Sequence, residues 1–262
     1  MGELTAEYRH MSTDTSESTR VGWQGWSVRL GFLTGVIGLL LLIATGPIYR
    51  MTGISNFGFV IQLLRWAAYL GLGAMAISAV GLLVQFSAGF RATTVALLAL
   101  AIGAFDFGLP YSLQNQAFSV PAIHDITTDT ENPPIFVAIV PLRANAPNTL
   151  DYSSEVAAQQ KAAYPEIQPL RLELVPDVAF TEAHEAAKGQ GWEIVDTDRS
   201  AGRIEATDTT FWYGFKDDVV VRIRSTGGGS LVDIRSKSRV GLSDVGANAE
   251  RIRSYRDSLT GD

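Results

Sequence analysis

The sequence contains no cysteine, and it has few charged residues over a long stretch near its N-terminus. Without cysteine the protein has no disulfide, no thiol nucleophile and no thiolate metal site. The charged residues between positions 30 and 110 are Arg50, Arg65, Arg91 and Asp106. A soluble fold rarely leaves so long a stretch without charge, whereas from Asp125 onward charged residues are as frequent as in soluble proteins. We therefore expect the two halves of the chain to face different solvents.

The 262-residue chain also lacks a basic surplus: 21 Lys and Arg stand against 27 Asp and Glu, a net charge of −6. Proteins that bind nucleic acid usually carry an excess of basic residues, so nucleic acid is not an expected partner. The sequence has no P-loop, dinucleotide fingerprint, nucleophile elbow or zinc-protease motif. We expect no cofactor and assign no metal site.

Three hydrophobic runs predict membrane-spanning helices over residues 30–48, 66–90 and 92–109. The first run extends over about 28 Å at about 1.5 Å per residue, close to a bilayer core of about 30 Å. Trp23 and Trp26 precede this run, where indole rings favour the membrane interface. A cleaved signal peptide with its site near residues 44–46 is the alternative for this run. Only the stretch Gly89–Arg91 separates the other two runs, so we expect an antiparallel helical hairpin.

Asp106 is the one acidic residue inside these runs. A carboxylate in a membrane helix is a functional candidate by default. Because Pro110 follows about one turn later, we expect Asp106 to lie near the helix end and to reach interfacial water, with a proton-relay role as the alternative. The small residues between Gly71 and Gly81 are expected either to permit close helix packing or to be ordinary membrane-helix composition.

Basic residues near the helix ends predict the orientation in the membrane. One set, assigned to the cytoplasm, is Arg9, Arg20, Arg29 and Arg91. The other side holds Arg50 and Arg65. This bias predicts a cytoplasmic N-terminus and a periplasmic C-terminal domain, in a bacterial inner membrane.

The second half of the chain predicts an α+β domain. Residues 111–150 form a long proline-rich connection, in which 135–140 is either a short strand or a segment lying on the folded domain. Over residues 151–262, alternation and turn signals predict the order β-α-β4-α, a curved antiparallel sheet with helices on one face. The expected strands are 170–175, 192–196, 203–209, 218–224 and 231–239. The expected helices are 154–164, 177–188 and 245–259, the last capped by Ser243 or Asp244.

The overall prediction is thus a polar tail over 1–27, a three-helix transmembrane region over 28–110, the connection over 111–150, and the α+β domain. Similar element orders occur in TATA-binding-protein-like and helix-grip folds, a comparison that concerns fold alone.

Three motifs resemble the signature of an uncharacterised bacterial and plastid family, domain of unknown function 1499. They are IHDITTDTENPP at 123–134, ATDTTFWYGF at 206–215 and RSKSRVGLSDVGAN at 235–248. The similarity covers about residues 118–260, and the membrane hairpin is an addition seen in some members. The resemblance implies an architecture and no particular activity.

The first motif contains the most chemically loaded segment, formed by His124, Asp125, Thr127, Thr128 and Asp129. An imidazole and two carboxylates are able to bind a divalent metal or to act as an acid/base pair. All of them lie on one predicted loop, with no spacing that enforces ligand geometry. We interpret the segment as a turn whose side chains bond nearby backbone N–H groups, and keep a metal or ligand site and catalysis as alternatives.

Two predicted strands carry cations at alternate positions. These cations are Arg222, Arg224, Arg235, Lys237 and Arg239. Antiparallel pairing would place them on one exposed sheet face, able to bind an anionic headgroup, a polyanion or an acidic protein. The favoured alternative is a solvated face balanced by Asp233, Glu205 and Glu250.

Phe211, Trp212, Tyr213 and Phe215 form a dense aromatic segment. We favour a place in the core. A partner anchor formed by Trp212, Tyr213 and Phe215, or an edge that touches the bilayer, is the alternative.

Together these patterns favour a membrane-anchored binding module, with membrane lipids and other membrane-protein subunits as partners. The alternatives are a metal-dependent or acid/base hydrolase centred on residues 124–129 and a lipid-binding protein with an apolar cavity.

The basic bias generates a test of orientation. Alkaline phosphatase fused after Asp262 is expected to be active, because the predicted odd number of spans carries the C-terminus out of the cytoplasm. An inactive phosphatase fusion together with a bright C-terminal fluorescent protein would reverse the predicted orientation.

Overall fold

The computed structural model describes residues 3–52, 57–86 and 93–261, with side chains described from Trp26 onward except at 85 and 86. The chain divides into two compact units, Met1–Gln114 (unit 1) and Asn115–Asp262 (unit 2).

Unit 1 is helical. Its helices are α1 (Glu3–Thr52), α2 (Phe57–Phe86) and α3 (Thr93–Ser119), whose last residues belong to unit 2. In the described parts of the chain, three helices are long and apolar enough to cross a membrane, over Trp26–Thr52, Phe57–Val84 and Thr93–Ser119. The three predicted spans are therefore confirmed as membrane-compatible helices.

The predicted helix bounds need correction. Helix α2 begins at Phe57, so Arg65 lies inside the helix and not before it. Helix α3 continues through Pro110 to Ser119, although we expected it to end before that proline. A proline removes one backbone hydrogen bond, but membrane helices tolerate this loss. The predicted turn at Gly89–Arg91 and the side chain of Trp23 lie outside the described residues.

Glycines allow the helices of unit 1 to approach closely. A Cβ atom added to Gly71 would lie 2.6 Å from the carbonyl oxygen of Gly103, whereas one added to Gly73 would meet its nearest neighbour at 3.9 Å. Asp106 lies in the middle of α3 and is buried, with Gly38 and Gly71 against its side chain. The expectation that Asp106 reaches interfacial water is therefore wrong, because α3 does not end at Pro110.

Unit 2 is built on a six-stranded sheet whose paired strands are all antiparallel. The strands are β1 (Asp125–Thr127), β2 (Leu170–Leu172), β3 (Glu193–Asp198), β4 (Arg203–Thr209), β5 (Lys216–Thr226) and β6 (Gly229–Ser238). Their order is β1-β6-β5-β4-β3, with β2 also paired to β6. Helices α4 (Ser154–Ala163), α5 (Pro176–Gly189) and α6 (Ala247–Thr260) complete the unit. The predicted α+β class and β-α-β4-α order are confirmed, with β1 as an additional strand.

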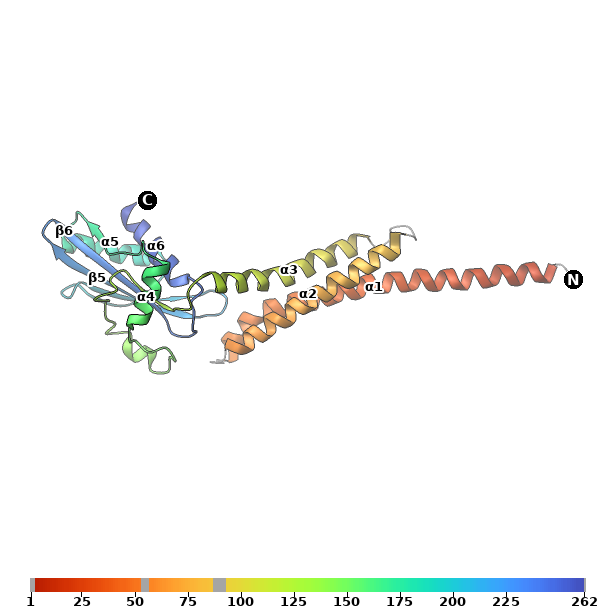
Figure 1. Cartoon of the computed structure of the whole chain (residues 1–262), viewed down its shortest axis with the longest axis horizontal. Coiled ribbons are helices and arrows are strands. Elements are labelled where there is room, and N and C mark those ends of the chain that lie inside the picture. Colours follow the sequence, from red (N-terminus) through yellow and green to blue (C-terminus); the bar gives the residue numbers. More distant parts are fainter. Residues whose placement is uncertain (1–2, 53–56, 87–92, 262) are drawn as a thin grey trace. The chain divides into compact units, whose positions relative to one another are not determined.

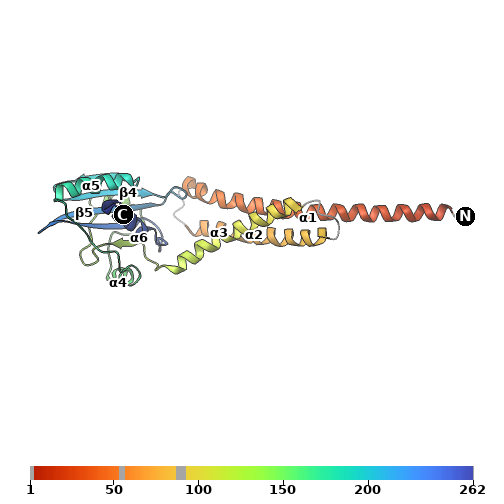
Figure 2. The ribbon, with the colours of Figure 1, turned by 90° about the horizontal axis from the view of Figure 1, so that it is seen from above.

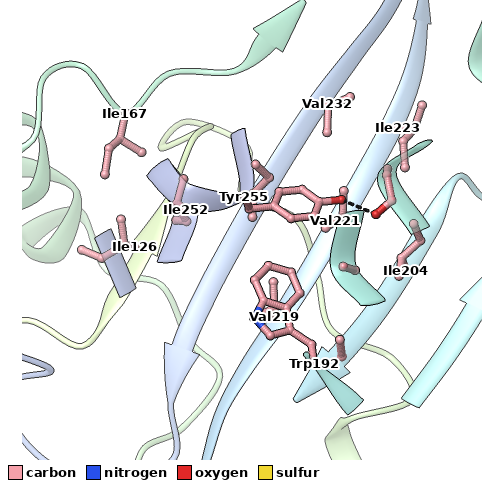
Figure 3. Packing of buried hydrophobic residues seen from close by; sticks show 14 of the residues in the cluster. Ile126, Ile167, Trp192, Ile204, Val219, Val221, Ile223, Val232, Ile252 and Tyr255 are labelled. Atoms are coloured by element: carbon pink, nitrogen blue, oxygen red, sulfur yellow. Dashed lines mark hydrogen bonds between the residues drawn. The ribbon is translucent and has the colours of Figure 1, made fainter. Parts of the chain in front are cut away.

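The hydrophobic core lies between the sheet and helices α5 and α6 (Figures 1 and 2). Alternate residues of β5 and β6, such as Val221 and Ile234, point toward these helices. Tyr255 of α6 stacks on Trp192 with ring centroids 5.0 Å apart, and its hydroxyl donates a hydrogen bond of 2.7 Å to the carbonyl oxygen of Ala183 (Figure 3). The prediction that the helices cover one face of the sheet is therefore correct.

The start of α6 differs in detail from the prediction. Gly246 is the N-cap residue, and the carboxylate of Asp244 accepts hydrogen bonds from the backbone N–H groups of Gly246 and Asn248. Asp244 thus satisfies free backbone donors of the helix start without being the N-cap residue itself.

The opposite face of the sheet is covered by the connection. We call residues 128–152 the cover segment. It includes the short helix η1 (Val140–Arg143), and its Phe136 and Ile139 pack with Val220 of β5 in a second, smaller apolar cluster. Residues 135–140 are therefore a segment lying on the folded domain and not a strand, which confirms the second of the two alternatives.

Candidate functional site

The sheet face beneath the cover segment gathers most of the chemically loaded side chains. The register aligns Asp125, Lys237 and Asp218 in one row across β1, β6 and β5. The next row contains Thr127, Arg235 and Glu205, because residues directly opposite each other point to the same face. We call this surface the covered face.

Asp125 is the centre of a buried ion-pair cluster. Its Oδ1 atom accepts from Nε of Arg235 at 2.9 Å, and its Oδ2 atom accepts from Nη2 of Arg235 at 2.7 Å and from Nζ of Lys237 at 2.5 Å. These side chains are only 2–3% exposed. Buried charges are tolerated when they are paired and their remaining donors are satisfied. Here the remaining donors reach the cover segment: Arg235 donates to the carbonyl oxygens of Pro134 and Leu150, and Lys237 donates to that of Asp151.

Asp218 forms a second anchor. It accepts hydrogen bonds from Arg143 at 2.6 Å, from Thr207 at 2.7 Å and from Arg239 at 2.7 and 2.8 Å. Burial tends to raise the pKa of Asp218, but the hydrogen bonds from Arg239, Thr207 and Arg143 outweigh it and hold the pKa below its ordinary value. The folded state thus favours the charged form of the Asp218 carboxylate. For Lys237, burial lowers the pKa of the ammonium group, and the charge of Asp125 partly opposes this lowering.

Glu205 holds the cover segment by its backbone. Its two carboxylate oxygens accept hydrogen bonds of 2.9–3.0 Å from the consecutive N–H groups of Val137, Ala138 and Ile139, and Arg203 pairs with the same carboxylate at 2.8 Å. Charged acceptors make stronger hydrogen bonds than neutral ones. The cover segment is therefore fixed in register on the sheet.

Asp129 and Asp233 both pair with the two arginines of β5, Arg222 and Arg224. Arg222 and Arg224 donate to Oδ2 of both carboxylates, over distances of 2.7–3.3 Å. The other oxygen of Asp129 accepts from the N–H groups of Glu131 and Asn132, so this residue also closes a local turn. This pair of arginines is more exposed than Arg235, because it lies at the margin of the cover segment.

Residues 125–127 of the predicted loop form the short edge strand β1, whereas His124, Thr128 and Asp129 lie outside that strand. Thr127 is held on both backbone groups by the side chain of Gln160, and the hydroxyl of Thr128 accepts from the backbone N–H of Ile234 at 2.9 Å. Asp125 and Thr127 point to the covered face, whereas Ile126 points to the helices. The prediction of a loop is wrong for residues 125–127, whose backbone pairs with β6. The interpretation that side chains of this segment bond nearby backbone N–H groups is confirmed at Asp129, which accepts from the N–H groups of Glu131 and Asn132.

The hypothetical acid/base or metal set does not converge. Nδ1 of His124 lies 3.3 Å from the carbonyl oxygen of Leu242, while Asp125 pairs with Lys237 and Asp129 pairs with Arg222. In the part of the chain that the structure describes, no group of three His, Asp or Glu side chains is placed to hold a metal ion.

The five predicted cations do share one face of the sheet. The expectation that this face is exposed is wrong, because the cover segment lies over it and removes Arg235 and Lys237 from solvent. The alternative of a solvated face is wrong for Arg235 and Lys237, whereas Arg222 and Arg224 keep 20% and 39% of their side chains exposed. Of the predicted balancing charges, Asp233 does pair with Arg222 and Arg224. Asp125 neutralises the β6 cations Arg235 and Lys237, and Asp218 pairs with Arg239, which directly follows β6.

The aromatic segment lies outside the core. Phe211 is 87% exposed and Trp212 is 40% exposed, with their rings tilted at 6.4 Å, and Tyr213 stacks on Phe215 at 5.2 Å. The favoured core interpretation is wrong because these residues form the turn between β4 and β5, beyond the area that α5 and α6 cover.

Sequence reasoning missed Arg143 and Asp218, and it assigned Glu205 only a balancing role. For Glu205 and Asp218 the sequence did contain an indication. Their chain neighbours Ile204 and Val219 point to the core, so by the alternation of a strand Glu205 and Asp218 point to the covered face. For Arg143 the sequence contained no such indication, because its contact with Asp218 spans 75 residues of sequence. The buried ion pairs and charged hydrogen bonds of the covered face thus fix the cover segment on the sheet.

One sequence family matches this part of the chain. The family described as "Protein of unknown function (DUF1499)" matches residues 125–259, slightly more than half of the 262 residues. The matched range contains β1, the cover segment and the covered face. No curated protein matches the chain.

The buried cluster generates a prediction about stability. Asp125→Ala is expected to lower the free energy of unfolding of unit 2 by about 3–5 kcal/mol, because it leaves two buried cations without their carboxylate. Glu131→Ala is the matched control: it removes an exposed ion pair with Lys161 and is expected to cost at most about 1 kcal/mol. Pulse proteolysis of the purified chain in urea measures both.

Equal stabilities of the two variants would show that Asp125 does not anchor the fold. Stoichiometric metal in the purified protein, lost in His124→Ala without loss of stability, would instead support a metal site.

Proposed function

The chain belongs to the DUF1499 family, whose function is unknown, and we propose that it is a membrane-anchored binding module rather than an enzyme. Three membrane-compatible helices precede the matched domain. The charged side chains of the covered face are engaged in ion pairs and hydrogen bonds that hold the domain's own chain. This engagement argues against acid/base catalysis by these side chains, and no observation favours the hydrolase or the lipid-cavity alternative.

We place the domain outside the cytoplasm, in the periplasm of a bacterium with the helices in the inner membrane. The support is the basic bias at the helix ends, with Arg50 in the last turn of α1. Arg65, now within α2, is exposed on its helix, and its long side chain is able to extend toward the same interface.

The observation that carries the proposal is the outer surface of the cover segment. While Phe136 and Ile139 point inward, Ile135, Val140 and Leu142 point outward and are 70%, 47% and 53% exposed. These side chains come from one short stretch of chain, so they form a local apolar strip. Exposed apolar strips of this kind mark interaction sites.

A strip on a fixed segment suits a protein partner. Glu205 and the ion pairs of the covered face hold the backbone in place, so binding costs little conformational entropy. We propose that the strip contacts another membrane-protein subunit, which makes the chain an accessory part of a larger membrane assembly, with membrane lipids around its helices.

Site-specific photo-cross-linking tests this proposal. A photoreactive phenylalanine analogue at position 140 is expected to cross-link the full chain to one membrane protein in cells that natively produce it. The matched control is position 178, an apolar residue of α5 with 43% exposure, which is expected to give no such product. Ile135→Glu should abolish the product from position 140, because it adds a charge to the apolar contact.

No cross-link from position 140, or the same products from positions 140 and 178, would refute the proposed partner surface. A product that is a second copy of this chain would replace the accessory role with self-association.

A further inference from the structure

Unit 2 exposes large apolar side chains at one end of its sheet. Phe211, Leu242 and Phe118 are 87%, 85% and 81% exposed, and Trp212 is 40% exposed. They come from three separate parts of the chain: the end of α3, the β4–β5 turn and the segment after β6. We call these four residues the apolar rim.

The sheet register places the turn and the segment after β6 at the same end. Thr209, the last residue of β4, pairs with Lys216, and Asp217 pairs with Ser238, the last residue of β6. The backbone N–H of Arg239 then donates to the carbonyl oxygen of Lys216 at 3.0 Å. The β4–β5 turn and residues 240–243 therefore leave the sheet side by side.

Hydrogen bonds tie the end of α3 to this same place. The side chain of Gln116 donates to the carbonyl oxygen of Val245 at 3.3 Å, and the N–H of Asp244 donates to that of Ile123 at 3.0 Å. Residues 116–124 thus run along the segment after β6. No free spacer separates the end of α3 from the apolar rim.

Helix α3 is also a candidate membrane span, over Thr93–Ser119. A domain that begins within the last turns of a membrane helix, and is hydrogen-bonded to them, starts at the membrane surface. The residues of the rim's loops suit that position: 209–215 and 240–243 contain no charged residue. Trp, Phe and Leu are side chains that favour the interfacial layer of a bilayer.

We propose that the apolar rim inserts into the interfacial layer of the membrane leaflet from which α3 emerges, so that unit 2 is docked on the lipid surface. The inference rests on the membrane anchoring in the proposed function but not on its protein partner. Docking on lipid would fix which sides of unit 2 are available to other proteins.

Spin labelling of the full chain in vesicles tests the rim. Because the protein has no cysteine, a single substitution gives a unique label. The test variant is Leu242→Cys. The matched control is Gly228→Cys in the β5–β6 turn at the other end of the sheet, where an added Cβ meets nothing within 4 Å. Phe211→Cys is a second test variant. Each is reconstituted in phosphatidylcholine–phosphatidylglycerol vesicles, and the accessibility of the label to oxygen and to a water-soluble nickel complex is measured.

We expect the labels at 242 and 211 to be several-fold more accessible to oxygen than to nickel, and the label at 228 to show the reverse. Labels at 242 and 211 that behave like the label at 228 would overturn the proposal. Labels at 242 and 211 that are shielded from both agents would overturn it as well, since they would be buried against protein. Resistance to alkaline carbonate extraction, measured in parallel, reports the anchoring separately, so the rim can fail while the anchor stands.

Discussion

Asp125 meets Arg235 and Lys237 beneath a layer of chain that excludes water, and the form of unit 2 depends on this contact. A sheet face with several buried charges is unstable alone unless every charge finds a partner. The sheet supplies some partners, and the cover segment supplies the rest through its carbonyl oxygens at Pro134 and Leu150. The connection between membrane helix and domain is thus part of the fold, which is why its prolines do not make it a loose linker.

The sequence was sufficient for elements whose pattern is local. Alternation along 203–209 and 218–224, and the glycines after Thr226, located the central strands and their hairpin. Parity also placed Arg222 and Arg235 on one face. Exposure of that face was beyond such reasoning, because burial depends on a segment that lies about 90 residues away in sequence, as in the contact of Arg235 with Leu150 at a separation of 85.

Two further errors share a physical origin. Pro110 ends helices in water more readily than in a membrane, where neighbouring groups satisfy the freed carbonyl. Because we took Pro110 as the helix end, we expected Asp106 at the membrane interface. In the structure Asp106 is buried, at a place where Gly38 and Gly71 leave room for its side chain. For Phe211 and Trp212, we took the high density of aromatic residues as an indication that they lie in the core. Their turn lies at the same end of the sheet as the last residues of α3. This position follows from the path of the chain and not from the amino-acid composition of the turn.

The central claim is that buried charge fixes the cover segment on the sheet, and hydrogen exchange of the Val137, Ala138 and Ile139 amides tests it most directly. In the wild-type chain these amides should be protected by Glu205, which accepts from all three. Glu205→Gln should accelerate their exchange by about ten- to hundredfold, as loss of about 1.5–3 kcal/mol from charged hydrogen bonds implies, while amides in the middle of β5 change less. Free exchange of the three amides in the wild type, or no change in the variant, would contradict this account.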